Sequence, residues 1–206
     1  MKVLTGNEHL VSNGRATKNT LLDFWKWNSS DLLNNTMRGA FAEFLVATAL
    51  DIDLSEAHVD WESYDLLGKN GERIEVKCSA YLQSWNAEEF THKPEKYSKI
   101  IFSISPALEW MREEAKYSKE PPKRHSDVYV FCHYKCKERK ADNPLNLDNW
   151  DFFVLATYKI NQIFGASRSV SRETLISRGQ PILCGYSEIR NAIEKEYADH
   201  LAHLNI

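Results

Sequence analysis

The 206-residue sequence predicts an α/β sandwich in which helices pack against a mixed β-sheet. Three observations support this fold class. A helical pattern occupies about residues 29–50, strand-like segments follow between about residues 59 and 158, and a second helical pattern begins at Ser187. Strands placed between helices along the chain are typical of a sheet covered by helices.

Two helices are predicted before the first strand. The first runs from about Thr20 to Trp27, where Thr20 and Asp23 have the spacing of a capping pair. Ser29-Ser30-Asp31 opens the second helix, which should end near Leu50. The second helix has two apolar stripes, so we expect it to be buried on more than one side.

The next two predicted strands cover about Val59–Leu67 and Glu72–Leu82, and a hairpin turn containing Asn70-Gly71 joins them. Side chains alternate strictly along the second strand, which is typical of a half-solvated strand. The side chains expected on its polar face are Glu75, Lys77, Ser79, Tyr81, Gln83 and Trp85.

The rest of the chain supplies further strands and a terminal helix. The predicted elements are strands at Lys99–Ile104, Asp127–Tyr134 and Asp151–Tyr158, a short helix at Ala107–Tyr117, a polar loop at residues 141–150 and a helix from Ser187. At this length we expect one domain, residues 1–206, with a core at about 20–160 and a C-terminal helical extension at about 161–206.

Composition excludes several classes of protein. No apolar run reaches the roughly 18 residues that a membrane-spanning helix needs, and the N-terminus lacks the apolar core of a secretory signal, so we expect a cytoplasmic protein without membrane contact. The four cysteines are irregularly spaced, as expected of reduced thiols, and Cys132-His133 with Cys136 lacks a second ligand pair for zinc.

Charge is balanced overall but uneven along the chain. The sequence has 26 Lys and Arg against 29 Asp and Glu, a net charge of −3, which excludes a polycation that coats nucleic acid. Between Arg112 and Lys140, nine basic residues stand against five acidic ones. This segment would suit a phosphate backbone, or it is a solvated pair of lysine-rich loops; the sequence leaves both open.

The most informative motif is Asp65 followed by Glu75-Val76-Lys77 on the next predicted strand. Two carboxylates can hold a hard divalent cation, and an adjacent ammonium can support an attacking water or the charge on a phosphate. Upstream, Glu43 is the one ionisable residue of the apolar stretch 39–50. Burying a lone carboxylate there costs on the order of several kcal/mol without a partner, so we expect Glu43 to be largely buried and to face the same place.

The hairpin register decides whether these acids can meet. If Asn70-Gly71 formed a two-residue turn, Asp65 would oppose Val76 and point away from Glu75. A three-residue loop of Lys69, Asn70 and a left-handed Gly71 would place Asp65 directly opposite Glu75. A catalytic role therefore predicts the three-residue loop, although the dipeptide alone favours the tighter turn.

With these positions in place, the sequence resembles the restriction-endonuclease-like, or PD-(D/E)XK, nuclease superfamily. Tyr64 stands where that family usually has a proline before the aspartate. The segments 30–39 and 75–85 are similar to a group of uncharacterised bacterial proteins assigned to the superfamily. The resemblance covers roughly residues 20–160 and implies an α/β/α sandwich with a central mixed sheet.

The resemblance also implies roles for individual residues. Asp65, Glu75 and the Val76 carbonyl would bind Mg²⁺ or Mn²⁺, Lys77 would position or deprotonate the attacking water, and Glu43 would orient that water or bind a second ion. The candidates for contact with nucleic acid are Arg38, Ser79, Tyr81, Gln83 and Trp85. For Trp85 the choice is base stacking or ordinary packing, and for Arg38 it is a phosphate or an internal acid.

Three functions compete. The favoured one is a metal-dependent nuclease that hydrolyses phosphodiester bonds of DNA or, with less support, RNA. The alternative is a non-catalytic nucleic-acid-binding or assembly module with the same fold. A third is a surface salt-bridge cluster with no ligand, against which Glu43 argues. A homodimer stays open.

Overall fold

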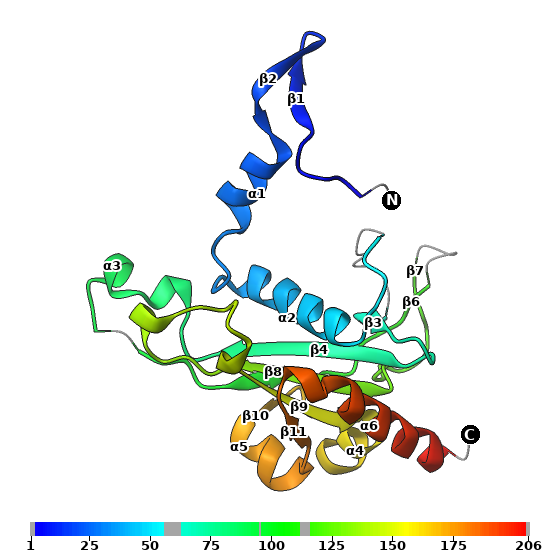
Figure 1. Ribbon diagram of the computed structural model, residues 1–206. Helices are drawn as coiled ribbons and strands as arrows, with labels where there is room; N and C mark the ends of the chain where they lie inside the picture. Colours follow the sequence, from blue (N-terminus) through cyan, green and yellow to red (C-terminus); the bar gives the residue numbers. More distant parts are fainter. Residues whose placement is uncertain (1–2, 56–62, 95, 112–115, 205–206) are drawn as a thin grey trace.

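The computed structural model describes residues 3–55, 63–94, 96–111 and 116–204. Its centre is a mixed sheet of five strands in the order β11-β9-β8-β4-β3, which confirms the predicted mixed sheet (Figure 1). The strands are β3 (Leu66–Leu67), β4 (Arg73–Ala80), β8 (Val128–Tyr134), β9 (Trp150–Ala156) and β11 (Ile182–Cys184). β4 runs parallel to β8, whereas the other neighbouring pairs are antiparallel.

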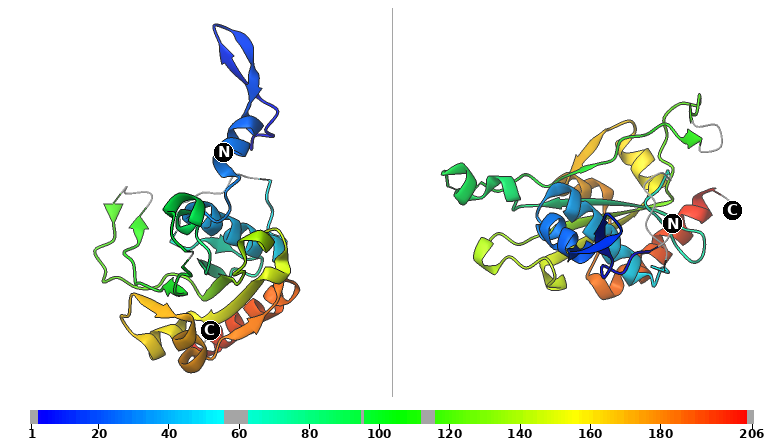
Figure 2. Two further views of the ribbon diagram at one scale, coloured as in Figure 1. Left: turned by 90° about the vertical axis from the view of Figure 1, so that its left-hand side faces the viewer. Right: turned by 90° about the horizontal axis from the view of Figure 1, so that it is seen from above.

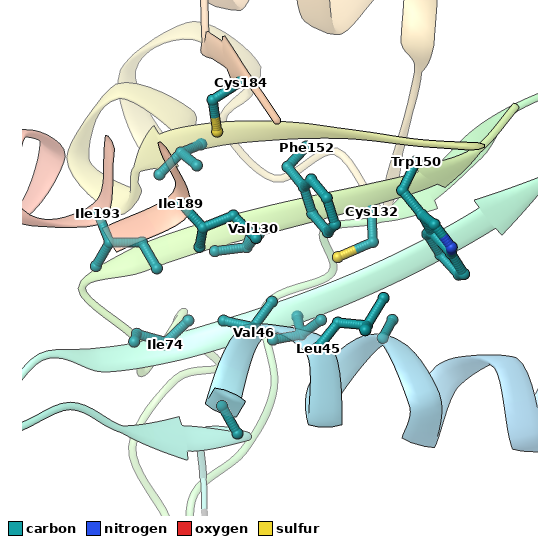
Figure 3. Packing of buried hydrophobic residues seen from close by; sticks show 14 of the residues in the cluster. Leu45, Val46, Ile74, Val130, Cys132, Trp150, Phe152, Cys184, Ile189 and Ile193 are labelled. Carbon is teal, nitrogen blue, oxygen red and sulfur yellow. The ribbon is translucent and has the colours of Figure 1, made fainter. Parts of the chain in front are cut away.

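One face of the sheet is covered by α2 (Asn35–Ala49) and α6 (Ile189–Leu204). Figure 3 shows Val46 of α2 against the apolar side chains of the strands, with Ile193 of α6 in the same cluster. Val46, Ile74, Val130 and Ile193 are completely buried. The even-numbered residues of β4 and β8 therefore point into this core, as the strand alternation predicts.

The opposite face carries a second apolar cluster. It is covered by α4 (Thr157–Phe164) and by a two-stranded antiparallel sheet of β5 (Ile101–Ser103) and β10 (Ser169–Ser171). Phe102 and Phe131 pack there with ring centroids 5.1 Å apart. Because odd-numbered residues of β4 point to this face, Glu75 and Lys77 lie on the side opposite to α2.

Two hairpins extend from the main sheet. β1 (His9–Ser12) and β2 (Arg15–Thr20) continue into α1 (Leu21–Ser29), and together they stand apart from the sheet (Figures 1 and 2). We call residues 3–30 the N-terminal arm. The second hairpin pairs β6 (Trp110–Met111) with β7 (Lys116–Tyr117). The remaining short helices of the described residues are Ser84–Asn86, α3 (Glu88–Thr91), Arg139–Ala141, Leu147–Asn149, α5 (Arg172–Thr174), Leu175–Gly179 and Tyr186–Glu188.

Local capping explains where the first helices begin. Thr20 and Asp23 form the predicted capping box at the start of α1. The helix expected to open at Ser29-Ser30-Asp31 starts later, because the Asn34 side chain accepts from the Thr36 amide and caps α2. Asp31 instead accepts from the Leu33 amide in the turn before α2, at 3.0 Å. α2 ends at Ala49, close to the predicted end.

Other predictions need correction. The helix expected at Ala107–Tyr117 is wrong: the described part of that segment forms β6 and β7, where Trp110 and Tyr117 pack edge to face across the hairpin. The strand expected at Val59–Leu67 is seen only as Leu66–Leu67, and residues 59–62 lie outside the described part. The strand expected to reach Tyr158 stops at Ala156, and α4 starts at Thr157.

Two of the expectations from the sequence concern membrane-spanning helices and the cysteines. Among the described residues, no helix has the length and apolar content needed to cross a membrane. All four cysteines are free thiols, as their spacing predicts.

Candidate active site

The hairpin between β3 and β4 has the register that a shared site requires. Leu66 pairs with Ile74 and Leu67 with Arg73, which is the register of a three-residue loop, and Asp65 lies directly beyond these pairs. The Gly68 amide donates to the Glu72 carbonyl at 2.8 Å and closes a three-residue loop, in which Gly71 has a φ of +90°. The predicted three-residue loop is confirmed.

Asp65 lies where β3 leaves the edge of β4. Its amide donates to the Ile74 carbonyl at 3.0 Å, and its carboxylate accepts from the Val76 amide at 2.7 Å. The amide and carbonyl of one strand residue face the same side, so the Val76 carbonyl faces this edge as well. The Asp65 carboxylate and the Val76 carbonyl therefore both lie at this edge. The Val76 amide fixes the orientation of the carboxylate.

Lys77 joins the two predicted acids. Its ammonium lies 2.5 Å from Glu75 Oε1 and 3.7 Å from Asp65 Oδ2. The side chains of Lys77, Asp65 and Glu75 are 27%, 26% and 19% exposed, so solvent reaches each of them. We call these three residues the acid–lysine cluster. The structure therefore brings together the acid pair and the lysine that the sequence singled out.

Burial and charge act in opposite directions on the cluster. Burial raises the pKa of Glu75, with the neighbouring Asp65 charge adding to the rise and the Lys77 ammonium opposing it. Burial alone would lower the pKa of Lys77, but the charges of Glu75 and Asp65 outweigh it and the pKa is raised. Lys77 is therefore an ammonium ion at neutral pH, suited to donate hydrogen bonds and to stabilise negative charge.

Glu43 approaches this cluster from the other side of the sheet. It lies on α2 and is half-buried, so the expectation that it would be largely buried was too strong. Its charge contributes to the raised pKa of Lys77, which places it within electrostatic reach of the cluster. No three His, Cys, Asp or Glu side chains in the described ranges lie close enough together to hold a metal ion.

Three of the expected nucleic-acid contacts are buried. Arg38 is 2% exposed, and its guanidinium donates to the Leu33 carbonyl at 2.7 Å and to Gln83 Oε1 at 2.9 Å. Gln83 follows the end of β4 and turns toward α2, and its amide donates to the Ala80 carbonyl. Ser79 is buried too. Arg38 and Gln83 thus direct polar groups at each other and at the backbone.

Tyr81 and Trp85 remain nearer the surface. The Tyr81 ring meets Tyr97 edge to face, and the Lys137 ammonium lies 4.3 Å from its centroid. Trp85 lies in the short helix after β4 and is 53% exposed. Of the five expected contacts, these two keep rings that solvent can reach.

Two neighbours of Glu75 were not anticipated. Tyr129 is the partner of Glu75 in the parallel pairing of β4 with β8. Burial first, and then the Glu75 charge, raise the pKa of the Tyr129 hydroxyl. The His125 charge acts on Glu75 in the opposite sense and lowers its pKa. The sequence near Glu75 could not predict either neighbour, because both depend on which distant strand pairs with β4.

The basic segment before Lys140 is largely engaged within the molecule. Arg124 donates to the Ile104 carbonyl at 2.8 Å, and Lys135 lies 2.7 Å from Asp151. Lys123 pairs with Glu120 at 3.3 Å on the surface. These cations are partly neutralised or fixed by protein groups, which favours the interpretation as solvated loops for this part of the segment.

Comparison with known families adds an independent observation. The family model described as Bacteriophage T4 endonuclease IV matches residues 5–167, which is most of the chain. The chain belongs to this family. The endonuclease IV match includes the N-terminal arm from residue 5 onward and the acid–lysine cluster, whereas α6 lies beyond it. A search of curated proteins found no match.

Proposed function

We propose that the chain is a metal-dependent DNA endonuclease of the PD-(D/E)XK type, with the acid–lysine cluster as its catalytic centre. The observation that carries the proposal is the meeting of Asp65 and Glu75 at one ammonium, inside the segment that matches the endonuclease IV family. The confirmed hairpin register supports it, since a two-residue turn would have turned Asp65 away from Glu75.

The donor groups at this edge suit a hard divalent cation. Asp65, Glu75 and the Val76 carbonyl offer oxygen ligands, which favour Mg²⁺ or Mn²⁺ over zinc. The bound cation would supply charge neutralisation at the phosphate and a more acidic water. Two carboxylates, rather than three, would hold it, because Glu43 approaches from the other face.

The chain's own residues would divide the remaining work. Lys77, held as an ammonium by its raised pKa, would donate hydrogen bonds to a phosphate oxygen and stabilise the charge that develops there. A charged lysine cannot accept a proton, so positioning of the attacking water is the role that fits it. Glu43 would orient that water from α2, and Asp65 is already oriented by the Val76 amide.

Nicking of supercoiled plasmid DNA tests the proposal. Wild-type protein should nick DNA with Mg²⁺ or Mn²⁺ and stop when chelator is added. Lys77→Ala should reduce the rate by about 10²-fold or more, the usual effect of removing one preorganised donor. Lys135→Ala is the matched control, because it also removes a lysine from an ion pair, 2.7 Å from Asp151. Nicking that survives both the chelator and Lys77→Ala would contradict the proposal.

A non-catalytic binding module is the second candidate. It is favoured by the ammonium of Lys77, which lies near both carboxylates and neutralises part of their charge. In that case Lys77→Ala should lower the melting temperature, and the wild-type protein should bind DNA without nicking it. Parallel assays with an RNA of the same length would show which nucleic acid is preferred.

A further inference from the structure

The N-terminal arm has almost no fully buried residue. Within residues 3–30 only Gly6 is buried, and α1 has no buried residue. The arm stands away from the sheet in Figure 1 and in the left view of Figure 2. An isolated two-stranded hairpin and a nine-residue helix are each marginally stable in water, so an arm of this kind is expected to function against a partner.

Two aromatic rings lie together on the outside of α1. Phe24 is 45% exposed and Trp27 is 83% exposed, and their centroids are 6.4 Å apart. Their spacing of three places them on the same side of the helix. Trp25 differs from them, because its ring packs against Gly6, where a Cβ atom would come within 3.0 Å. Trp25 therefore holds the arm together, and Phe24 with Trp27 faces outward.

The arm has more positive than negative side chains. Arg15, Lys18 and Lys26 are exposed, and none of them forms an ion pair with another described residue. The arm's two acids are used locally. Glu8 accepts from the Gly6 amide at 2.9 Å, and Asp23 accepts from the Thr20 amide at 2.8 Å. The arm thus has three cations against two carboxylates, an excess of one positive charge on a chain whose net charge is −3.

We infer that the N-terminal arm is a second nucleic-acid contact, separate from the acid–lysine cluster. Phe24 and Trp27 would stack on bases, and Arg15, Lys18 and Lys26 would bind phosphates. Every base presents a flat π-face, so this contact suits unpaired bases and bases opened within a duplex. The inference rests on the proposed function, since it supplies a substrate contact for that same activity.

A second copy of the chain fits the arm less well. In a symmetric contact the two arms present the same surface to each other. Each surface has three cations and two carboxylates, so two arms meet with the same excess of positive charge, which disfavours association. A phosphate backbone neutralises all three. Charge complementarity therefore favours nucleic acid as the partner of the arm.

Binding in the presence of chelator tests the arm without cleavage. The probes are a fluorescein-labelled 20-nucleotide single strand and its duplex, followed by fluorescence anisotropy. We expect Phe24→Ala/Trp27→Ala to weaken binding by about 10-fold or more through lost stacking. Lys18→Gln should make the slope of log K against log salt concentration shallower by about 0.7–0.9, the value for one phosphate contact. A greater loss for the single strand identifies stacking on unpaired bases, and an equal loss identifies contact with opened duplex bases.

Matched controls come from surfaces far from the arm. Leu183→Ala removes an exposed apolar side chain of β11, at the other edge of the sheet from β3. Lys195→Gln removes an exposed lysine of α6. Both should bind the two probes like the wild type. Because Phe24 and Trp27 are exposed, their double variant should also keep the wild-type melting temperature.

Two results would overturn the inference. One is unchanged affinity of the double variant for both probes. The other is a change from dimer to monomer, measured by light scattering, with unchanged affinity per chain, because the arm would then be a contact between copies. A Lys77→Ala background separates this inference from the proposed function: nicking should be lost there, and Phe24→Ala/Trp27→Ala should still weaken binding by the same factor as in the wild type. Loss of affinity without any wild-type nicking would overturn the proposed function alone.

Discussion

Lys77 is the residue at which metal binding by the acid–lysine cluster can be tested most directly. Its ammonium lies 2.5 Å from Glu75 and so competes with any cation for that carboxylate. Lys77→Met keeps an unbranched apolar side chain and removes the charge. We expect this variant to bind Mn²⁺ about 10-fold more tightly at pH 7, since two adjacent carboxylates then lack a counter-charge. Isothermal titration calorimetry measures it.

The same measurement on Lys135→Met provides the comparison. That lysine also pairs with a carboxylate, Asp151, at 2.7 Å, but away from the acid–lysine cluster. Its Mn²⁺ affinity should equal that of the wild type. Equal affinities in all three proteins would show that the cluster does not bind the metal.

The raised pKa of Glu75 sets a pH dependence for metal binding. Burial raises the pKa of this carboxyl above its ordinary value of 4.5. A protonated carboxyl is a poor metal ligand. Mn²⁺ affinity should therefore fall as the pH drops through a midpoint above 4.5. The glutamine of Glu75→Gln does not titrate, so the weaker Mn²⁺ affinity of this variant should not show the fall with pH that Glu75 causes. A wild-type midpoint below 4.5 would contradict the assignment.

A single dipeptide shows how far local sequence can determine a turn. Asn13-Gly14 forms a two-residue turn with φ values of +50° and +73°, between paired Ser12 and Arg15. Asn70-Gly71 lies in a three-residue loop instead. There the Glu72 carboxylate accepts from the Asn70 amide at 2.9 Å and from its side chain at 2.8 Å. The Asn-Gly dipeptide is thus compatible with a two-residue turn and with a three-residue loop. The three-residue loop at Asn70-Gly71 was predicted from the requirement that Asp65 lie near Glu75.

At the scale of elements, the loop before β4 has a conformation that glycine alone adopts easily. Gly71 has a φ of +90°, where an added Cβ is strained by roughly 1–2 kcal/mol. Gly71→Ala should lower the free energy of unfolding by about that amount in urea denaturation. Gly39→Ala is the control, because Gly39 lies within α2 with nothing within 4 Å of an added Cβ. It should stabilise the protein by about 0.5–1 kcal/mol. Two changes of equal sign would contradict this account.

Elements with strong periodicity were predictable, and those that depend on distant partners were not. β4 and α6 follow from alternation and from apolar residues spaced by four. The segment 107–117 has helical composition, but its bridge from Ala107 to Lys123 and its Trp110–Tyr117 contact are non-local. For the same reason the acid pair could be predicted from one hairpin, whereas its neighbour Tyr129 required the pairing of β4 with β8.

At the scale of the whole molecule, α6 belongs to the main core although the endonuclease IV match ends before it. Ile193 of this helix is completely buried against the same cluster as Val46 of α2. Ile193→Ala should lower the free energy of unfolding by about 2–5 kcal/mol, measured in urea. Leu204→Ala, at an exposed position of the same helix, should change it by less than about 0.5 kcal/mol. A loss below about 0.5 kcal/mol for Ile193→Ala as well would show that α6 is dispensable for the core.

The parallel pairing of β4 with β8 also sets the order in which the protein can fold. Ile74 meets Val128 only after the whole segment from residue 81 to residue 127 has been looped out, and closing such a loop loses chain entropy before any contact forms. Asp65 and Glu75 need only a short hairpin. During synthesis this hairpin is complete before β8 has been made. The acids that the proposed chemistry depends on are thus among the first groups the growing chain can bring together, and the sheet that carries them is among the last parts to close.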